Sequence, residues 1–170
     1  MSKIEQIEKT INEIAHVLGD NEKLCRLLYI DSPDALTKPN FIKPSFQTLF
    51  DEKYINTTPQ QQSGVLELGR NTLIILRISS LRFTEDSNNV QVYADCAIIT
   101  NLNTVRLDNN RDRALLIADV IEEELTNHKF SSAGEVQVDN IDNQVYSEYE
   151  FGYVLSFSFQ DQVTKKKVEI

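Results

Sequence analysis

Two apolar segments joined by a short polar turn constrain the fold of this chain most strongly. Residues 72–83 form a nearly continuous apolar run, which is typical of a strand covered on both faces in its first half. From Val90 to Ile98, apolar residues alternate with mostly polar ones, and this period of two predicts a half-buried strand. Residues 84–89 between them are polar and typical of a turn. The sequence therefore predicts a long antiparallel hairpin of residues 72–83 and 90–100.

The segment after this hairpin has the periodicity of an amphipathic helix over residues 109–127. Asp108 is the expected N-cap, with the two asparagines that follow it as alternatives. The predicted buried stripe consists of Ala114, Ile117, Ala118, Ile121 and Leu125, widened by Leu115 and Val120. Asp119, Glu122 and Glu123 fall together on the opposite face of the helix, because their spacing matches the helical turn.

The end of the chain predicts further strands. Residues 136–141 and 144–149 are expected to pair around a turn at residues 142–143, and the alternation over residues 152–159 predicts the final strand. This part is rich in aromatic residues: Tyr146, Tyr149, Phe151, Tyr153, Phe157 and Phe159. The favoured interpretation is a sheet face packed against the 109–127 helix, since aromatic residues suit strands. A subunit interface is the alternative.

Two short helices are predicted at the N-terminus. Residues 3–18 carry one apolar stripe, formed by Ile4, Ile7, Ile11, Ile14 and Leu18. Gly19 follows the last apolar position, where a left-handed cap residue is expected. Asp20 or Asn21 then caps a second helix near residues 21–30.

Residues 31–64 are the irregular part of the sequence. All four prolines lie here, and each removes a backbone donor and disfavours a helix before it. Residues 57–64, at the end of this part, have almost no apolar content, which predicts an exposed loop. We expect this loop to become ordered by contact with a partner on assembly. The candidate assembly residues of this loop are Thr57, Thr58, Gln60, Gln61 and Gln62. Residues 65–68 that follow are expected to form a short strand.

The order of these elements predicts an α+β fold. We expect an antiparallel sheet with one long helix packed across it, preceded by an N-terminal helical hairpin. The expected divisions are a helical hairpin at 1–30, an irregular linker or loop region at 31–64, an α+β core domain at 65–160 and a polar tail at 161–170.

Composition limits the classes of function. The chain has 170 residues and a net charge of −9, which argues against a nucleic-acid binder that relies on phosphate contacts. Residues 108–160 hold most of that charge, and we interpret them mainly as a solvated face. The alternative is a surface that repels an anionic partner. Two cysteines exclude a disulfide scaffold, no apolar run is long enough for a membrane helix, and the charged start does not indicate secretion.

No motif of catalysis or metal binding is complete. The two histidines and two cysteines are too scattered for a zinc site. Asp108, Asn110 and Asp112 match the opening of a calcium loop, but Arg113 stands where that loop needs a glycine. The five glycines are dispersed, so no phosphate-binding loop is present in the sequence. We therefore expect no metal, no cofactor and no enzyme activity, and the same melting temperature with and without a chelator.

Two stretches of sequence carry a resemblance to a known family. One is the opening "NEKLCRLLYIDSPDAL", and the other is "NNRDRALLIADVIEEELTN", followed at the C-terminal end by "GYVLSFSFQD". Together with the order of elements, they resemble neck and tail-completion proteins of tailed bacteriophages, particularly those of the tail terminator type. The N-terminal helix at 3–18 is an addition to that pattern.

The resemblance implies a small α+β subunit that forms a homo-oligomeric ring, usually a hexamer, in the neck of the virion. Such a ring ends the tail tube, contacts tail-tube and head-connector proteins, and lets DNA pass without binding it. The acidic residues Asp119, Glu122 and Glu123 are the candidates to face that channel, because like charges repel. Three alternatives stay open: a head-tail connector or adaptor of the same neck, a small enzyme without a recognisable motif, and a small cytosolic binding module.

Overall fold

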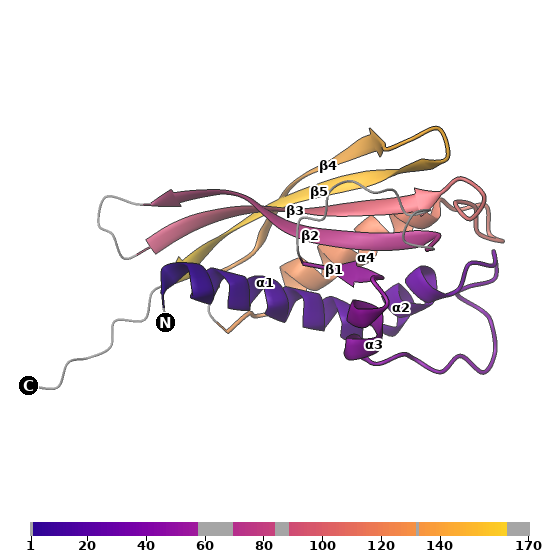
Figure 1. Cartoon of the computed structure of the whole chain (residues 1–170), viewed down its shortest axis with the longest axis horizontal. Coiled ribbons are helices and arrows are strands. Elements are labelled where there is room, and N and C mark those ends of the chain that lie inside the picture. The colour runs from indigo at the N-terminus through magenta and orange to yellow at the C-terminus, as the bar shows by residue number, and fades with distance from the viewer. Residues whose placement is uncertain (1, 58–69, 84–88, 132, 163–170) are drawn as a thin grey trace, which may run out of the picture.

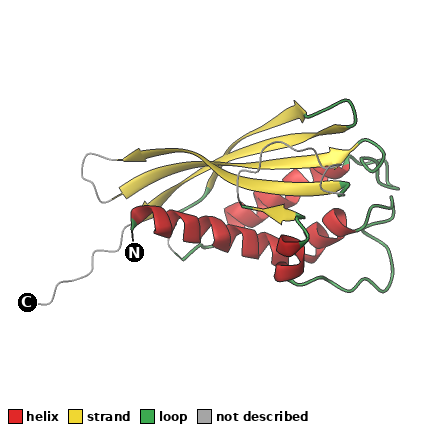
Figure 2. Cartoon of the chain, viewed as in Figure 1, coloured by secondary structure: helices red, strands yellow, loops and turns green. Residues whose placement is uncertain are grey.

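The computed structural model describes residues 2–57, 70–83, 89–131 and 133–162. It is an α+β fold in which a five-stranded sheet carries helices on one face (Figures 1 and 2). The strand order is β1-β2-β3-β5-β4, with β1 parallel to β2 and every other neighbouring pair antiparallel. The strands are β1 (Ile55–Asn56), β2 (Thr72–Phe83), β3 (Asn89–Asn101), β4 (Gln137–Val145) and β5 (Glu150–Gln162).

The predicted central hairpin is confirmed. β2 and β3 pair from Thr72 opposite Thr100 to Phe83 opposite Val90. The register shifts between Ile78 and Ser80, so one extra residue of β2 is accommodated by a β-bulge. The apolar residues of β3 that alternate in sequence face the helices and are buried, as the period of two predicts.

The long helix of the core, α4 (Arg113–Asn127), begins four residues later than predicted. Its N-cap is Asp112, whose side chain accepts a hydrogen bond from the backbone N–H of Leu115 at 3.0 Å. Leu115 lies one turn before Asp119 on the outer side of the helix with 48% of its surface exposed, so the expectation that it widens the buried stripe is wrong. Ala114, Ile117, Ala118, Val120, Ile121 and Leu125 are buried as predicted, and Leu116 joins them.

The two N-terminal helices are α1 (Lys3–Asp20) and α2 (Glu22–Tyr29). Ser2 and Glu5 form a capping box at the start of α1, and Asn21 caps α2, one of the two residues expected there. Gly19 is not a left-handed cap, because α1 continues through it. The ring of Phe46 occupies the place where a side chain at this position would project, and a Cβ on Gly19 would lie 2.6 Å from that ring.

The region after α2 contains two elements that the prediction of an irregular segment missed. The helix α3 (Phe46–Asp51) is capped by Ser45, whose hydroxyl accepts from the backbone N–H of Thr48 at 3.1 Å. β1 follows it and adds a short parallel strand beside Ile74 and Ile75 of β2. The strand expected at residues 65–68 lies outside the described residues.

The C-terminal strands differ from the expected hairpin. β4 runs straight through residues 142–143, where a turn was predicted, and pairs with β5 along its length. The turn lies at residues 146–149 instead, where the backbone N–H of Tyr146 donates to the carbonyl of Glu150. Polar residues at 139–144 resemble a turn in sequence, but here they belong to an edge strand with one side open to water.

One hydrophobic core joins the helices to the sheet. Its buried residues come from α1, α2, α4 and the helix side of the strands. Phe157 and Phe159 are buried in it, with ring centroids 6.5 Å apart, and Phe151 and Tyr153 pack against it, so the interpretation as a packed sheet face is confirmed for these four. Tyr149 is exposed and takes no part in it. Tyr146 packs instead in a small second cluster with Leu73, Ile75 and Ile99. α1 lies along the same side of the sheet as α4, so two long helices cover this face where one was expected.

Candidate functional site

A fully buried arginine, Arg113, organises one end of the molecule. Its Nε donates to the carbonyl of Thr104 at 2.7 Å, and its Nη1 donates to Leu27 and Ile30 at 2.8 and 2.6 Å. Its Nη2 donates to the carbonyls of residues 31 and 32 at 3.1 and 2.9 Å. Arg113 is 0% exposed, and in the described part of the chain its side chain donates to backbone carbonyls at all five of these contacts. One side chain thereby ties the end of α2, the turn after β3 and the start of α4 together.

Burial lowers the pKa of the Arg113 guanidinium, while the nearby Asp31 carboxylate raises it. Arginine stays protonated in proteins, so a positive charge is held in this buried place. The carbonyls at the C-terminal end of α2 carry the negative end of the helix dipole, which stabilises a cation there. The arrangement fixes the backbone of residues 30–32, which form the wall of a neighbouring hollow.

The hollow has a volume of about 770 Å³ and lies between α2 and the segment that leads to α3. Its lining is Tyr29, Ile30, Asp31, Ser32, Lys38, Pro39, Asn40, Phe41, Ile42, Pro44 and Thr48. The polar groups at its wall are already engaged: the Asp31 carboxylate accepts from the amide of Asn71 at 2.6 Å. Ile42 at its rim is 87% exposed.

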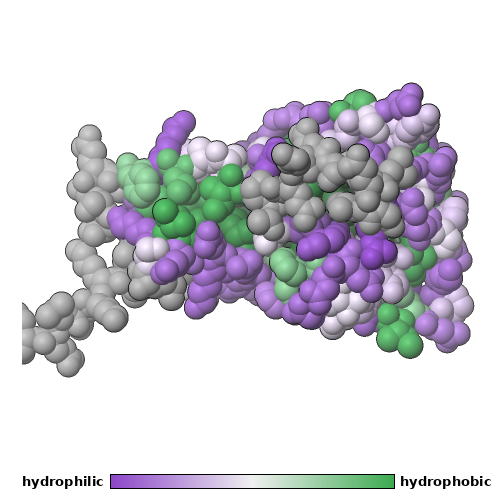
Figure 3. Space-filling view, viewed as in Figure 1, coloured by the Kyte–Doolittle hydropathy of each residue, from purple (hydrophilic) through white to green (hydrophobic). Residues whose placement is uncertain are grey.

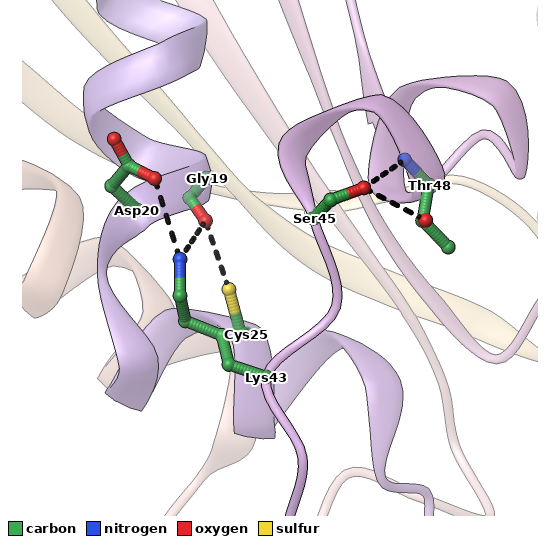
Figure 4. Close-up of polar contacts among 6 residues, drawn as sticks. All are labelled: Gly19, Asp20, Cys25, Lys43, Ser45 and Thr48. Atoms are coloured by element: carbon green, nitrogen blue, oxygen red, sulfur yellow. Dashed lines mark hydrogen bonds and ion pairs between the residues drawn. The ribbon is translucent and has the colours of Figure 1, made fainter.

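Cationic side chains attach the segment around the hollow to the helices. The Arg26 guanidinium lies 4.6 Å from the ring centroid of Phe41 and donates to the carbonyl of Lys38 at 2.9 Å. Lys43 reaches the end of α1, where its Nζ lies 3.4 Å from the carbonyl of Gly19 and 3.3 Å from a carboxylate oxygen of Asp20 (Figure 4). These contacts hold a segment without regular structure in a defined place.

The predicted acidic face of α4 is present as a surface. Asp119 and Glu123 are exposed and Glu122 is half-buried, on the side away from the core. The neighbouring Glu124 has a different role, because its carboxylate accepts from the side-chain amide of Asn21 at 2.6 Å and links α4 to the N-cap of α2. The sequence grouping of the three acids is therefore also a grouping in space.

The candidate assembly loop is only partly visible. Thr57 follows β1 and is half-buried, whereas Thr58, Gln60, Gln61 and Gln62 lie outside the described residues.

Groups with metal-binding or nucleophilic chemistry do not gather in the described part of the chain. No three side chains of His, Cys, Asp or Glu come together there as a metal site. Cys25 and Cys96 are buried, and burial raises the pKa of both thiols, that of Cys25 to about 11. His16 packs against Phe46 with ring centroids 3.7 Å apart. Among the described residues, the helices lack the length or apolar character that a membrane span requires.

Asp161 at the end of β5 is the one buried carboxyl with an oxygen lacking a partner among the described residues. Its other oxygen accepts from the amide of Gln6 in α1 at 3.3 Å. Burial raises the pKa of Asp161 above its ordinary value of 3.8. The folded state therefore binds this proton more tightly than the unfolded state, and stability falls as the pH rises through the folded-state pKa.

We expect Asp161→Asn to increase the free energy of unfolding at pH 7, because the neutral amide removes the cost of burying a charge. The increase should shrink as the pH falls toward 3.8, where the wild-type carboxyl is protonated as well. Urea unfolding at both pH values measures it. Asp119→Asn, on an exposed carboxyl, is the matched control, and a stability gain independent of pH would contradict this account.

Arg113 was not among the predicted site residues, although its position in the helix carries a signal. A basic residue in the first turn of a helix opposes the helix dipole, so such a residue calls for another partner. Here that partner is a set of carbonyls from distant parts of the chain, which only the folded structure brings together.

The fold and this site define a small α+β protein with helices on one face of a mostly antiparallel sheet, and with a buried arginine that joins three backbone segments. The YomW family model matches residues 21–159, and the chain belongs to this family. The family is named after a Bacillus phage or prophage gene, and this name links the chain to phages or prophages. No curated protein matches the chain.

Proposed function

We propose that the chain is a structural subunit of a phage neck, in which copies form a ring that ends the tail tube and joins the tail to the head. Membership of a family named after a phage or prophage gene, over residues 21–159, is the observation that carries this proposal. The tail terminator type rests on the sequence resemblance. A connector of the same neck would share these features, and the experiment below separates the two.

The architecture supports a role in assembly rather than catalysis. Among the described residues, β4 and most of β2 have no strand partner on their outer sides, which leaves these edges available for contacts between subunits. Arg113 and the five backbone carbonyls to which it donates form a hub that holds three backbone segments in place without presenting a reactive group. Rigid surfaces of this kind favour association, because their side chains and loops lose little conformational freedom on binding.

The acidic face of α4 is proposed to line the channel through which DNA passes. Its side chains are free of the core contacts that the opposite side of α4 makes, so their charge acts on the surroundings. A lining that repels phosphate lets DNA move without adhering to the wall.

Changing Asp119, Glu122 and Glu123 together to lysine tests this assignment. The isolated subunit should keep its melting temperature within a few degrees, because exposed charges contribute little to stability. Particles should still join, but infectivity should fall at least about tenfold, because a basic wall binds the phosphates of DNA. The matched control is Glu8, Glu135 and Glu148 changed to lysine, which gives the same change of net charge at exposed residues outside α4. Normal infectivity of the α4 variant would reject the channel role.

The neck role itself is tested by electron microscopy of particles from a phage whose copy of this gene carries an early stop codon. A tail terminator predicts overlong tails separate from filled heads, and the intact gene supplied in trans should restore joining. Tails of normal length beside unjoined heads would instead indicate the connector. Complete, infectious particles without the protein would contradict the proposal.

A further inference from the structure

The sheet ends in two open strand edges. β4 pairs with β5 on one side, and no described strand pairs with its other side. β1 pairs with β2 only beside Ile74 and Ile75, so in the described chain the outer edge of β2 is open from Leu76 to Phe83. Open edges of this length are templates for pairing with another strand.

Both open edges expose apolar side chains on the helix side of the sheet. On β2 these are Ile78 and Phe83, 37% and 62% exposed, and Lys3 at the start of α1 lies 5.9 Å from the ring centroid of Phe83. Figure 3 shows this hydrophobic surface gathered where β2 ends and α1 begins. On β4 the corresponding side chains are Ile141 and Val145, 37% and 67% exposed. Each edge therefore exposes apolar side chains on the same face of the sheet as the hydrophobic core.

The other face of the sheet carries opposite charges at the two edges. Arg77 and Arg82 lie on β2, paired in register with Asp95 and Gln91 of β3. Asp142 lies on β4 opposite Val154 of β5, Asp139 lies in the bulge of β4 between Val138 and Asn140, and no basic residue is found in that strand. A β2 edge is thus basic and a β4 edge is acidic.

This distribution distinguishes between modes of association. Two copies joined by a twofold axis would set β2 against β2 or β4 against β4, which places like charges across the contact and is unfavourable. A β2 edge against a β4 edge brings opposite charges together. The alternation of directions across β2, β3, β5 and β4 makes β2 and β4 antiparallel, so copies rotated about an axis along the strands continue the sheet in the same pattern.

We infer that the β2 edge (76–83) of one copy binds the β4 edge (137–145) of the next copy, forming a head-to-tail interface that continues the sheet. The contact covers the exposed apolar residues of both edges and pairs Arg77 and Arg82 with Asp139 and Asp142. Repeated head-to-tail contacts close into a ring when the rotation per copy allows it. This inference rests on the proposed ring and specifies how it is built.

Charge reversal at one edge at a time tests the inference. Arg82→Glu alters the β2 edge, and it is preferred to a change at Arg77, which already contacts Asp95 at 3.5 Å. Asp139→Lys alters the β4 edge at the carboxylate nearest Arg82, because antiparallel strands that pair both arginines place Arg77 beside Asp142 and Arg82 beside Asp139. Each variant alone should need at least about tenfold more protein to assemble, as measured by sedimentation velocity, because every contact then joins like charges.

A mixture of the two variants gives the decisive result. In equal amounts they can alternate, so that each contact again joins opposite charges, and assembly should return to near the wild-type concentration. Misfolding cannot explain such a recovery, since neither variant repairs the fold of the other. Arg111→Glu and Asp108→Lys are the matched controls, because they make the same charge changes at exposed residues of the loop between β3 and α4, outside both edge strands.

The outcomes separate this inference from the proposed function. Assembly lost in each variant and restored in the mixture supports the β2–β4 contact. Wild-type rings that persist unchanged in both variants would overturn the contact while leaving the ring proposal intact. Loss of assembly without recovery on mixing would also overturn the contact. If the wild-type chain stays a monomer and its edges bind another protein, both the contact and the ring are rejected.

Discussion

Replacing Arg113 by alanine is expected to lower the free energy of unfolding by about 3–5 kcal/mol, the largest effect of any single substitution proposed for this protein. The substitution leaves five backbone carbonyls without this donor, three of them in fully buried hydrogen bonds, and it opens a cavity. Buried acceptors without a partner are costly. Urea unfolding followed by circular dichroism measures the change.

Two control variants make this result specific. Arg113→Lys keeps the charge but not the planar fork of donors, so it should recover only part of the loss. Arg111→Ala removes an exposed arginine two residues away and should change stability by less than about 0.5 kcal/mol. Equal stability of Arg113→Ala and wild type would show that the hub is not needed for the fold.

Gly152→Ala is expected to destabilise the protein by at least about 3 kcal/mol. Gly152 lies in β5 opposite Ile99 of β3, and a Cβ at this position would lie 1.8 Å from the carbonyl oxygen of Ile98. The neighbouring atom belongs to the backbone of a central strand, so it cannot move aside as a side chain could. Thermal unfolding of the purified variant measures the loss.

Gly134→Ala is the matched control for this substitution. A Cβ on Gly134 would lie 3.5 Å from the carbonyl oxygen of Gln160, an ordinary contact with the same strand, β5. We expect the stability of this variant to stay within about 1 kcal/mol of the wild type. If the two alanine variants were equally stable, the close approach of β5 to β3 would not be a constraint on the fold.

The parts of the fold that were predicted correctly are those set by local periodicity. The β2–β3 hairpin and the helices α1, α2 and α4 each carry an apolar repeat long enough to identify the element and its buried side. Element boundaries were less certain, because Asp108 and Asp112 are both good N-caps and only the fold selects Asp112.

The parts that were missed depend on contacts between distant segments. β1 is two residues long and exists because β2 offers an edge beside it. β4 has a turn-like composition, and pairing with β5 extends it in spite of that. The carbonyls around Arg113 come from residues 27–32 and 104, so no local pattern could reveal that site.

The candidate surfaces were predicted to different degrees. The acidic group on α4 follows from spacing on one helix, and the structure places it outside the core as expected. The opposite charges of the two sheet edges could not be foreseen, because the strand order that makes β2 and β4 the edges is a property of the assembled sheet.

The mass of the purified chain in solution tests the central claim most directly. Light scattering across a range of protein concentrations should show a discrete closed assembly, about 117 kDa for six copies of the 19.5 kDa chain. A single species of 19.5 kDa at every concentration would contradict a ring built by this protein alone.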